Sequence, residues 1–224
     1  EKSHSVSLSA DMYRRFGAFQ CNLLLEGFYT RLNHVFVLEE IGKDEEHNAV
    51  IKERRNGQGA EVAGVTVEGK VAYLSLVQLQ AGVTWQKSHY TRPEKWSKDS
   101  SVPAEKRIFR TPDWYGYFTA TYSPVKPLNI ALSGTYTGSM IVQHMKGYIP
   151  KDIAVTTPDF FDMNLKISYD FSLYKFITLQ LNAGIQNIFN AYQRDFDQGK
   201  ERDSGYIYGP SMPRSYFAGA KLMF

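Results

Sequence analysis

Apolar and polar residues alternate with a period of two along most of this 224-residue sequence. Within residues 177–186, for example, Ile177, Leu179 and Leu181 fall on one side of an extended chain and Thr178 falls on the other. Successive side chains of a β-strand point to opposite faces, whereas an amphipathic helix repeats every 3.6 residues. The alternation therefore predicts an all-β protein whose strands each have one apolar and one polar face.

The pattern predicts about nine strands, most of them near or above the roughly 10 residues that a tilted strand needs to cross a bilayer. It is clear in residues 5–13, 77–86, 128–138, 161–170, 177–186 and the last segment to Phe224, and weaker in residues 18–37, 60–70 and 112–122.

The connections between these segments alternate between short and long. The short ones lie near residues 14–17, 70–75, 123–127 and 172–175, and the long polar ones near residues 39–56, 88–110, 142–157 and 190–211. Outer-membrane barrels have this arrangement, with short periplasmic turns and long extracellular loops. We therefore expect a transmembrane antiparallel β-barrel, with Phe224 at the periplasmic end and Glu1 at the extracellular end.

The composition is consistent with a membrane barrel. No run of roughly 18 apolar residues exists, which excludes a transmembrane helix. Mean hydropathy is −0.37, because only one face of each barrel strand meets lipid. Aromatic residues reach 14%, enough for interfacial girdles, and the single cysteine rules out an intrachain disulfide. The mixed charges, with a net charge of +3, give no reason to expect nucleic acid as a partner.

The odd strand count suggests that these strands belong to a larger structure. Complete single-chain bacterial barrels have an even number of strands, and an open edge in lipid leaves backbone groups unpaired at a cost of several kcal/mol each. We expect residues 1–224 to be the C-terminal portion of a larger β-barrel domain, about its last nine strands. A miscount of one strand would instead make a self-contained small porin or adhesion barrel.

Two segments near the end of the chain resemble a known family. Residues 183–192, Ala-Gly-Ile-Gln-Asn-Ile-Phe-Asn-Ala-Tyr, resemble the G-x-x-N-(I/L)-F-(N/D) segment on the penultimate strand of TonB-dependent outer-membrane receptors. Residues 209–214, Gly-Pro-Ser-Met-Pro-Arg, are similar to that family's G-R-P-R approach to its last strand, which here ends at Phe224. Residues 26–30 and 64–68 resemble mid-barrel strands of the same family.

The resemblance implies a function and partners. Receptors of this family have a barrel of about 22 strands with a plugged lumen. The resemblance implies TonB-dependent import of a scarce nutrient, such as an iron–siderophore complex, haem or cobalamin, captured by extracellular loops. The plug and the segment that contacts the TonB complex would lie upstream, outer-membrane lipid would surround the strands, and a surface lipoprotein is a further candidate partner. No cofactor is implied beyond iron or cobalt in the cargo.

Candidate ligand-binding residues lie in the predicted outer loops. Aromatic and basic side chains there suit an anionic or ring-bearing ligand, through stacking and cation–π contacts. Each has a structural alternative: the tryptophan and tyrosines can belong to an interfacial girdle or pack a loop against itself, and a loop histidine can simply be solvated. The candidates are His89, Tyr90, Arg92, Trp96, His144, Tyr148, Tyr206 and Tyr208.

Catalysis has little support in the sequence. It contains no G-x-S-x-G, H-E-x-x-H or P-loop motif. Asp195 and Asp197 are close carboxylates, but Arg194, Lys200 and Arg202 surround them, which favours a salt-bridge cluster over an acid–base pair. A calcium site at these aspartates is a minority interpretation, because the rest of the EF-hand spacing is absent. We therefore predict no enzyme activity and no catalytic, cofactor or metal site.

The strand alternation also assigns side chains to faces. Trp85 and Tyr136 are expected in the membrane girdle, and Cys21 is expected to face lipid as a small hydrophobe. The polar positions expected to face the lumen, and a plug inside it, are Tyr115, Tyr117, Asn164, Lys166, Gln180 and Asn182.

Overall fold

The computed structural model describes residues 1–44, 46 and 49–224, and these residues form strands, turns and loops without a helix. No helix long and apolar enough to cross a membrane occurs in that part of the chain. The strands of the main sheet are β1 (Lys2–Phe16), β2 (Phe19–Asn33), β5 (Ala60–Tyr73), β6 (Val77–Glu94), β8 (Trp114–Val125), β9 (Leu128–Thr137), β12 (Phe160–Tyr174), β13 (Ile177–Gln186) and β14 (Ser215–Met223). The short strands are β3 (Phe36–Asp44), β4 (Ala49–Asn56), β7 (Glu105–Arg107), β10 (Ile141–His144) and β11 (Ile153–Thr156).

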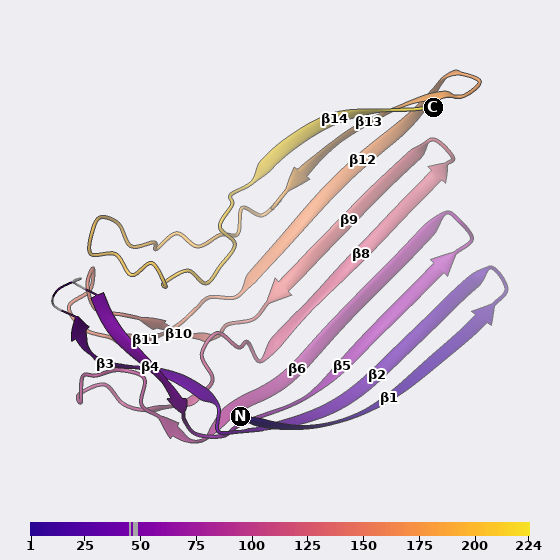
Figure 1. Ribbon diagram of the computed structural model, residues 1–224. Helices are drawn as coiled ribbons and strands as arrows, with labels where there is room; N and C mark the ends of the chain where they lie inside the picture. Colours follow the sequence, from indigo (N-terminus) through magenta and orange to yellow (C-terminus); the bar gives the residue numbers. More distant parts are fainter. Residues whose placement is uncertain (45, 47–48) are drawn as a thin grey trace.

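The main sheet has the strand order β1-β2-β5-β6-β8-β9-β12-β13-β14, with β7 paired to the outer part of β6. Every neighbouring pair is antiparallel and follows the chain order, so the sheet is a meander (Figure 1). The nine strands predicted from the alternation are confirmed as these nine.

Short turns and long loops lie at opposite ends of the strands (Figure 1). Two residues connect β1 to β2, β8 to β9, and β12 to β13, and three connect β5 to β6. The N-terminus lies at the long-loop end and the C-terminus at the turn end, as expected. The β3–β4 and β10–β11 hairpins lie within long loops and were not predicted. The expected strand at 18–37 also differs, because β2 ends at Asn33 and β3 begins at Phe36.

The strand register gives the sheet one apolar and one polar face. Trp85 lies opposite Val65 on one side and Trp114 on the other, while Leu165 lies opposite Leu132 and Ile185. Because directly opposed residues point to the same side, the predicted apolar positions of all nine strands form one continuous face. Cys21 shares it. The polar face carries the residues expected in the lumen, among them Tyr117, Asn164 and Gln180.

Aromatic side chains form a band near each end of the apolar face. The band at the turn end includes the Phe19–Tyr73 ring pair, with 4.7 Å between centroids. The band at the long-loop end includes the Trp85–Trp114 pair, at 6.4 Å. On β6 the nine residues from Val77, at the turn end, to Trp85 span about 27 Å at the rise of an extended strand. This length matches the apolar band of roughly 25 Å in outer-membrane barrels.

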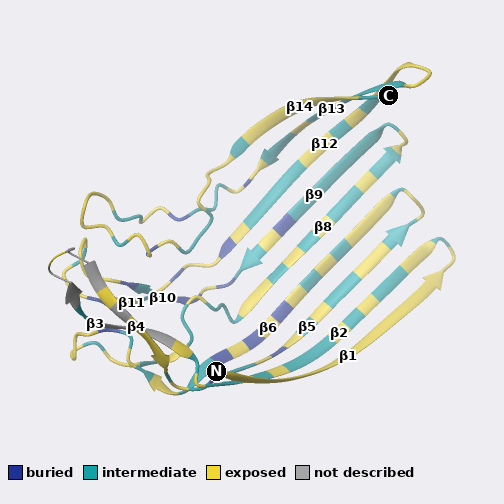
Figure 2. Ribbon diagram, viewed as in Figure 1, coloured by how far each residue is buried: buried dark blue, intermediate teal, exposed yellow. Residues whose placement is uncertain are grey.

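Burial is concentrated at the long-loop end of the sheet (Figure 2). β1 and β14 form the two separate edges of the sheet, and every residue of β1 is exposed. The buried apolar side chains of the described residues gather instead where the loops meet the strands: Ala60, Met140, Ile141, Val142, Phe160 and Tyr206.

Candidate functional site

The last long loop, residues 187–214, is closed at its neck by two asparagines. Asn187, at the end of β13, donates from its side-chain nitrogen to the carbonyl oxygens of Ala191 and Met212, at 3.1 and 3.0 Å. The Oδ1 atom of Asn190 accepts a bond from the backbone N–H of Arg214 at 2.9 Å. Both asparagines have positive φ, 51° and 55°, a conformation in which asparagine is enriched. The N-I-F-N sequence thus both turns the chain and ties the two ends of the loop together.

An apolar cluster joins this loop to the β10–β11 hairpin. Met140 and Val142 of the hairpin pack with Tyr206 of the last loop, and Val155 and Tyr208 pack against them. Val142 is fully buried. The two loops therefore share a small hydrophobic core.

A buried polar network surrounds that core. His144 of β10 directs Nε2 at the carboxylate of Asp197 in the last loop, at 3.0 and 2.9 Å from its two oxygens. The side chains are 8% and 3% exposed. The His144 ring also stacks on the Tyr206 ring, with centroids 3.7 Å apart and planes within 7°. A carboxylate can only accept here, so the imidazole presents its N–H to Asp197.

Asp195 accepts hydrogen bonds from both tyrosines of the last loop. The Tyr206 hydroxyl donates to Oδ2 at 2.9 Å and the Tyr208 hydroxyl to Oδ1 at 2.6 Å. Burial raises the pKa of Tyr206 to about 12, together with the hydrogen bond to Asp195, and the same causes raise the pKa of Tyr208. Burial alone would raise the pKa of Asp195, but the hydrogen bonds from the two tyrosines outweigh it and hold that pKa below its usual range.

Gln193 anchors the polypeptide around the two tyrosines. It is 1% exposed, donates from Nε2 to the Tyr206 carbonyl at 3.0 Å, and accepts from the Tyr208 N–H at 2.8 Å. Both ends of its amide are therefore satisfied, as buried polar groups require.

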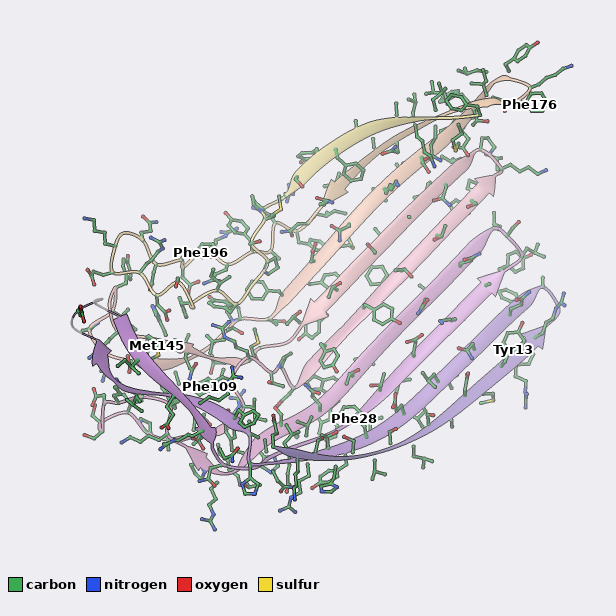
Figure 3. All side chains as sticks on the ribbon, viewed as in Figure 1. Tyr13, Phe28, Phe109, Met145, Phe176 and Phe196 are labelled. Atoms are coloured by element: carbon green, nitrogen blue, oxygen red, sulfur yellow. The ribbon has the colours of Figure 1, made fainter. Side chains whose placement is uncertain are left out.

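A third loop, residues 95–113, is bonded to the same assembly. The Arg110 guanidinium donates to the carbonyl oxygens of Gly205 and Ile207, the latter at 2.6 Å. The Ser97 hydroxyl donates to Asp152 beside the β10–β11 hairpin at 2.6 Å. We refer to the joined loops 95–113, 138–159 and 187–214 as the loop assembly. It lies at the end of the sheet marked by Phe109, Met145 and Phe196 in Figure 3, opposite the turns marked by Tyr13 and Phe176.

The structure divides the eight predicted ligand residues into groups. His144, Tyr206 and Tyr208 hold the loop assembly together, and the first two are almost completely buried. Tyr148 lies in the connection between β10 and β11 and is 57% exposed, and Met145 of the same connection is 37% exposed. Trp96 lies in the third loop, where its ring contacts Phe109 edge-on at 5.3 Å.

The predicted loop position of His89, Tyr90 and Arg92 needs a correction, because β6 continues to Glu94 and these residues lie on a strand. The alternation loses its apolar half beyond Trp85 although the chain still pairs with β5. His89 shares the apolar side with Trp85, and its Nε2 is 3.8 Å from a Glu61 oxygen.

The expected salt-bridge cluster around Asp195 and Asp197 also needs correction. The two aspartates bond to tyrosines and to His144, whereas the Arg194 guanidinium lies over the Tyr192 ring at 5.2 Å and Arg202 donates to the Gly199 carbonyl. The partners of the two aspartates are therefore tyrosine and histidine side chains, and not the basic residues near them in sequence. No group of three or more histidine, cysteine or acidic side chains suited to a metal ion occurs in the described part of the chain.

Comparison with known proteins identifies the family. The family model for the TonB dependent receptor-like β-barrel matches residues 1–188, so the chain belongs to this family of outer-membrane receptors. Such receptors are transporters and not enzymes. A search of curated protein sequences found no match.

Solved structures share the fold. The ferric-catecholate import receptor Fiu from K12 E. coli superposes with a TM-score of 0.63 at 16% identity, over 99% of this chain and 27% of that one. The ferric enterobactin receptor PfeA from Pseudomonas aeruginosa gives 0.59 at 15%, over 99% and 31%. The siderophore receptor PirA from Acinetobacter baumannii gives 0.55 at 15%, over 99% and 32%. The chain thus spans about a third or less of the length of these receptors.

Proposed function

We propose that residues 1–224 form part of a larger barrel in a receptor that imports an iron–siderophore complex through the outer membrane. Membership of the TonB-dependent family over residues 1–188 carries this proposal. The separate sheet edges at β1 and β14 support the larger barrel, because unpaired strand edges are costly in lipid.

The choice of cargo is supported by what similar structures bind. Fiu is described as a ferric-catecholate receptor, PfeA as a ferric enterobactin receptor, and another neighbour is a ferripyoverdine receptor bound to its ligand. At identities of 16% or less these neighbours share a fold and not a binding site. Haem and cobalamin, which the sequence left open, therefore serve as the competing cargoes in the test.

Cargo capture is proposed at the exposed surface of the loop assembly. Tyr148 and Met145 project from a turn whose hairpin is fixed by the buried His144–Asp197 pair. A ring held on a rigid support can stack on an aromatic or chelating ligand at little cost in conformational entropy. Trp96 of the adjacent loop is the second proposed contact. His144, Tyr206 and Tyr208 take a supporting role in this proposal.

Energy coupling would come from partners outside this chain. In this proposal a plug inside the barrel and the TonB complex act through upstream segments, and the polar face of the sheet contacts the plug. Lipid surrounds the apolar face. A surface lipoprotein that covers the loops is a further proposed partner.

Calorimetry on the full-length receptor tests the cargo. We expect binding of a ferric catecholate siderophore, and no comparable binding of haem or cobalamin. Tyr148→Ala should weaken the siderophore about three- to tenfold, the value of one aromatic contact. Tyr174→Ala, at the exposed turn end, is the matched control and should leave affinity unchanged. Tight binding of cobalamin or haem alone would reject the proposed cargo.

A further inference from the structure

The hydrogen-bond pattern of the β10–β11 hairpin determines which of its backbone groups point outward. The Thr157 N–H donates to the Met140 carbonyl oxygen at 2.8 Å, directly beside the paired residues of the hairpin. Bonded and non-bonded pairs alternate along an antiparallel ladder. Ala154 and Thr156 of β11 therefore fall at non-bonded positions, and their N–H and C=O groups point away from β10.

The two edges of this hairpin differ in their occupation. On β10 the outward carbonyl oxygen of Ile141 accepts a hydrogen bond from the Arg110 backbone N–H at 2.8 Å, so loop 95–113 already covers that edge. On β11, no hydrogen bond among the described residues reaches the outward backbone groups of Ala154 or Thr156, and both residues are exposed. The edge of β11 therefore offers two N–H and two C=O groups with the spacing that a neighbouring strand requires.

β11 also lacks the features that usually protect an edge strand. Natural proteins place charges, proline or bulges on such edges to prevent further pairing. The short strands β3, β4 and β7 each contain charged residues, and β7 consists entirely of them. β11 has the sequence Ile-Ala-Val-Thr, without charge or proline, and its Ile153 is 36% exposed. This sequence favours a further strand beside β11.

The exposed edge has a firm support. Val155 of β11 packs against the buried cluster that contains Val142 and Tyr206. The buried His144–Asp197 pair joins the same hairpin to the last loop. An edge that is already held in the strand conformation loses little conformational entropy when a peptide is added to it.

We propose that β11 binds an extended segment of a second protein at the cell surface, which pairs with it as an antiparallel strand. Strand addition of this kind takes its affinity from main-chain hydrogen bonds and its specificity from alternate side chains. A charged residue opposite Ile153 to Thr156 would meet no opposite charge on β11, so the complementary segment is uncharged as well. The site lies apart from the proposed cargo contacts and does not depend on the identity of the cargo.

Fluorescence anisotropy on the full-length receptor tests the site, with the labelled peptide Thr-Val-Thr-Val-Thr as the probe. Its first residue would lie opposite Thr156 and its third opposite Ala154, which places the two valines beside Val155 and Ile153. Up to four backbone hydrogen bonds give an expected dissociation constant of about 0.1–1 mM.

N-methylation of single peptide residues separates strand addition from other modes of binding. The N–H of the third residue would face β11, whereas that of the second would face away. Methylation of the third residue should therefore weaken binding at least about tenfold, because it removes one bond and blocks close approach. Methylation of the second residue is the matched control and should leave binding unchanged.

The receptor offers a second matched pair. Ala154→Pro removes an outward N–H without taking a bond from the hairpin, which proline tolerates on an edge strand, and it should weaken the peptide about as much as the third methyl group. Ala154→Ser keeps the donor and should bind like the native receptor. Because the methylated peptides are compared on the native receptor, the test holds even where the proline variant fails to fold.

Equal binding of the two methylated peptides would overturn the proposal, as would the absence of binding by the unmodified peptide at about 10 mM. Self-association of the native receptor that Ala154→Pro abolishes would assign the edge to a second copy of the receptor and also contradict it.

Discussion

His144 and Asp197 are 53 residues apart in sequence, yet the histidine Nε2 lies 2.9 Å from a carboxylate oxygen in a site where both side chains are almost completely buried. Each comes from a different long loop. The pair therefore fixes the β10–β11 hairpin against the last loop, and the same contact holds the turn that carries Tyr148. This relationship makes the loop assembly one unit instead of three independent loops.

Removing one partner of this pair should loosen the loops and spare the barrel. His144→Ala leaves a buried carboxylate without its partner, which typically costs about 3–5 kcal/mol. We expect faster hydrogen exchange in residues 138–159 and 187–214 of the full receptor, with unchanged protection of β12 and β13. Tyr148→Ala, exposed in the same hairpin, should change neither. Unchanged exchange in both loops of the His144 variant would show that the pair does not hold them.

The Asp195–tyrosine contacts predict a defined pH range for the loop assembly. The folded pKa of Asp195 is lowered, so its contribution is present above about pH 4, the ordinary value for aspartate, and is lost as pH falls through the lowered value. The pKa of Tyr206 is raised to about 12, so its contribution is complete below about pH 10 and is lost as pH rises toward 12.

Ultraviolet titration measures the alkaline limit. The difference between the native receptor and Tyr206→Phe should be one phenol that ionises near pH 12. A difference that titrates near pH 10 would mean that Tyr206 is exposed and unbonded. On the acid side, Asp195→Asn should remove the pH dependence of loop proteolysis below about pH 4.

The neck of the last loop should depend on Asn187. Its amide forms three hydrogen bonds across the loop, and it is 4% exposed. Asn187→Ala removes those bonds and places alanine at positive φ, so we expect a loss of about 2–4 kcal/mol and rapid proteolysis within residues 187–214. Asn187→Gly relieves the backbone strain but not the lost bonds, and should fall between alanine and the native residue. Equal behaviour of the two variants would place the whole effect in the side chain.

Gly184 should be required for close strand packing. A Cβ there would clash with the Leu165 carbonyl oxygen and with the Phe217 ring. Gly184→Ala should therefore destabilise the β12–β13–β14 region by about 1–3 kcal/mol, seen as a lower yield of heat-modifiable folded barrel in gel electrophoresis. Gly69→Ala, also in a strand but with no atom within 4 Å of the added Cβ, is the control. A yield as high as the control would contradict the packing argument.

The sheet could be predicted from the sequence because its determinants are periodic. Alternation at positions such as Ile177 to Ile185 fixes which face meets lipid, and neighbouring strands meet in chain order. The same reasoning predicted a β6 that is too short, because residues 87–90 pair with β5 and Glu94 pairs with β7 without an apolar side to mark them. Strand pairing beyond the membrane needs no alternation in hydrophobicity.

The loop assembly could not be predicted in this way. The bonds from His144 to Asp197 and from Arg110 to Ile207 link residues 53 and 97 apart, and no period connects them. Nearby charges made Arg194 and Arg202 attractive partners for Asp195, but burial favoured the tyrosine hydroxyls. The motif around Asn187 did mark a conformationally unusual segment. The physical reason is that Asn187 and Asn190 both adopt positive φ.

The proposed function is TonB-dependent import of an iron–siderophore complex by the receptor to which this chain belongs. Uptake of radiolabelled ferric catecholate by cells whose only siderophore receptor is the full-length protein tests it most directly. We expect uptake in cells with TonB and uptake at background in otherwise identical cells without it. Equal uptake in the two strains, or import of cobalamin or haem but not of the siderophore, would contradict it.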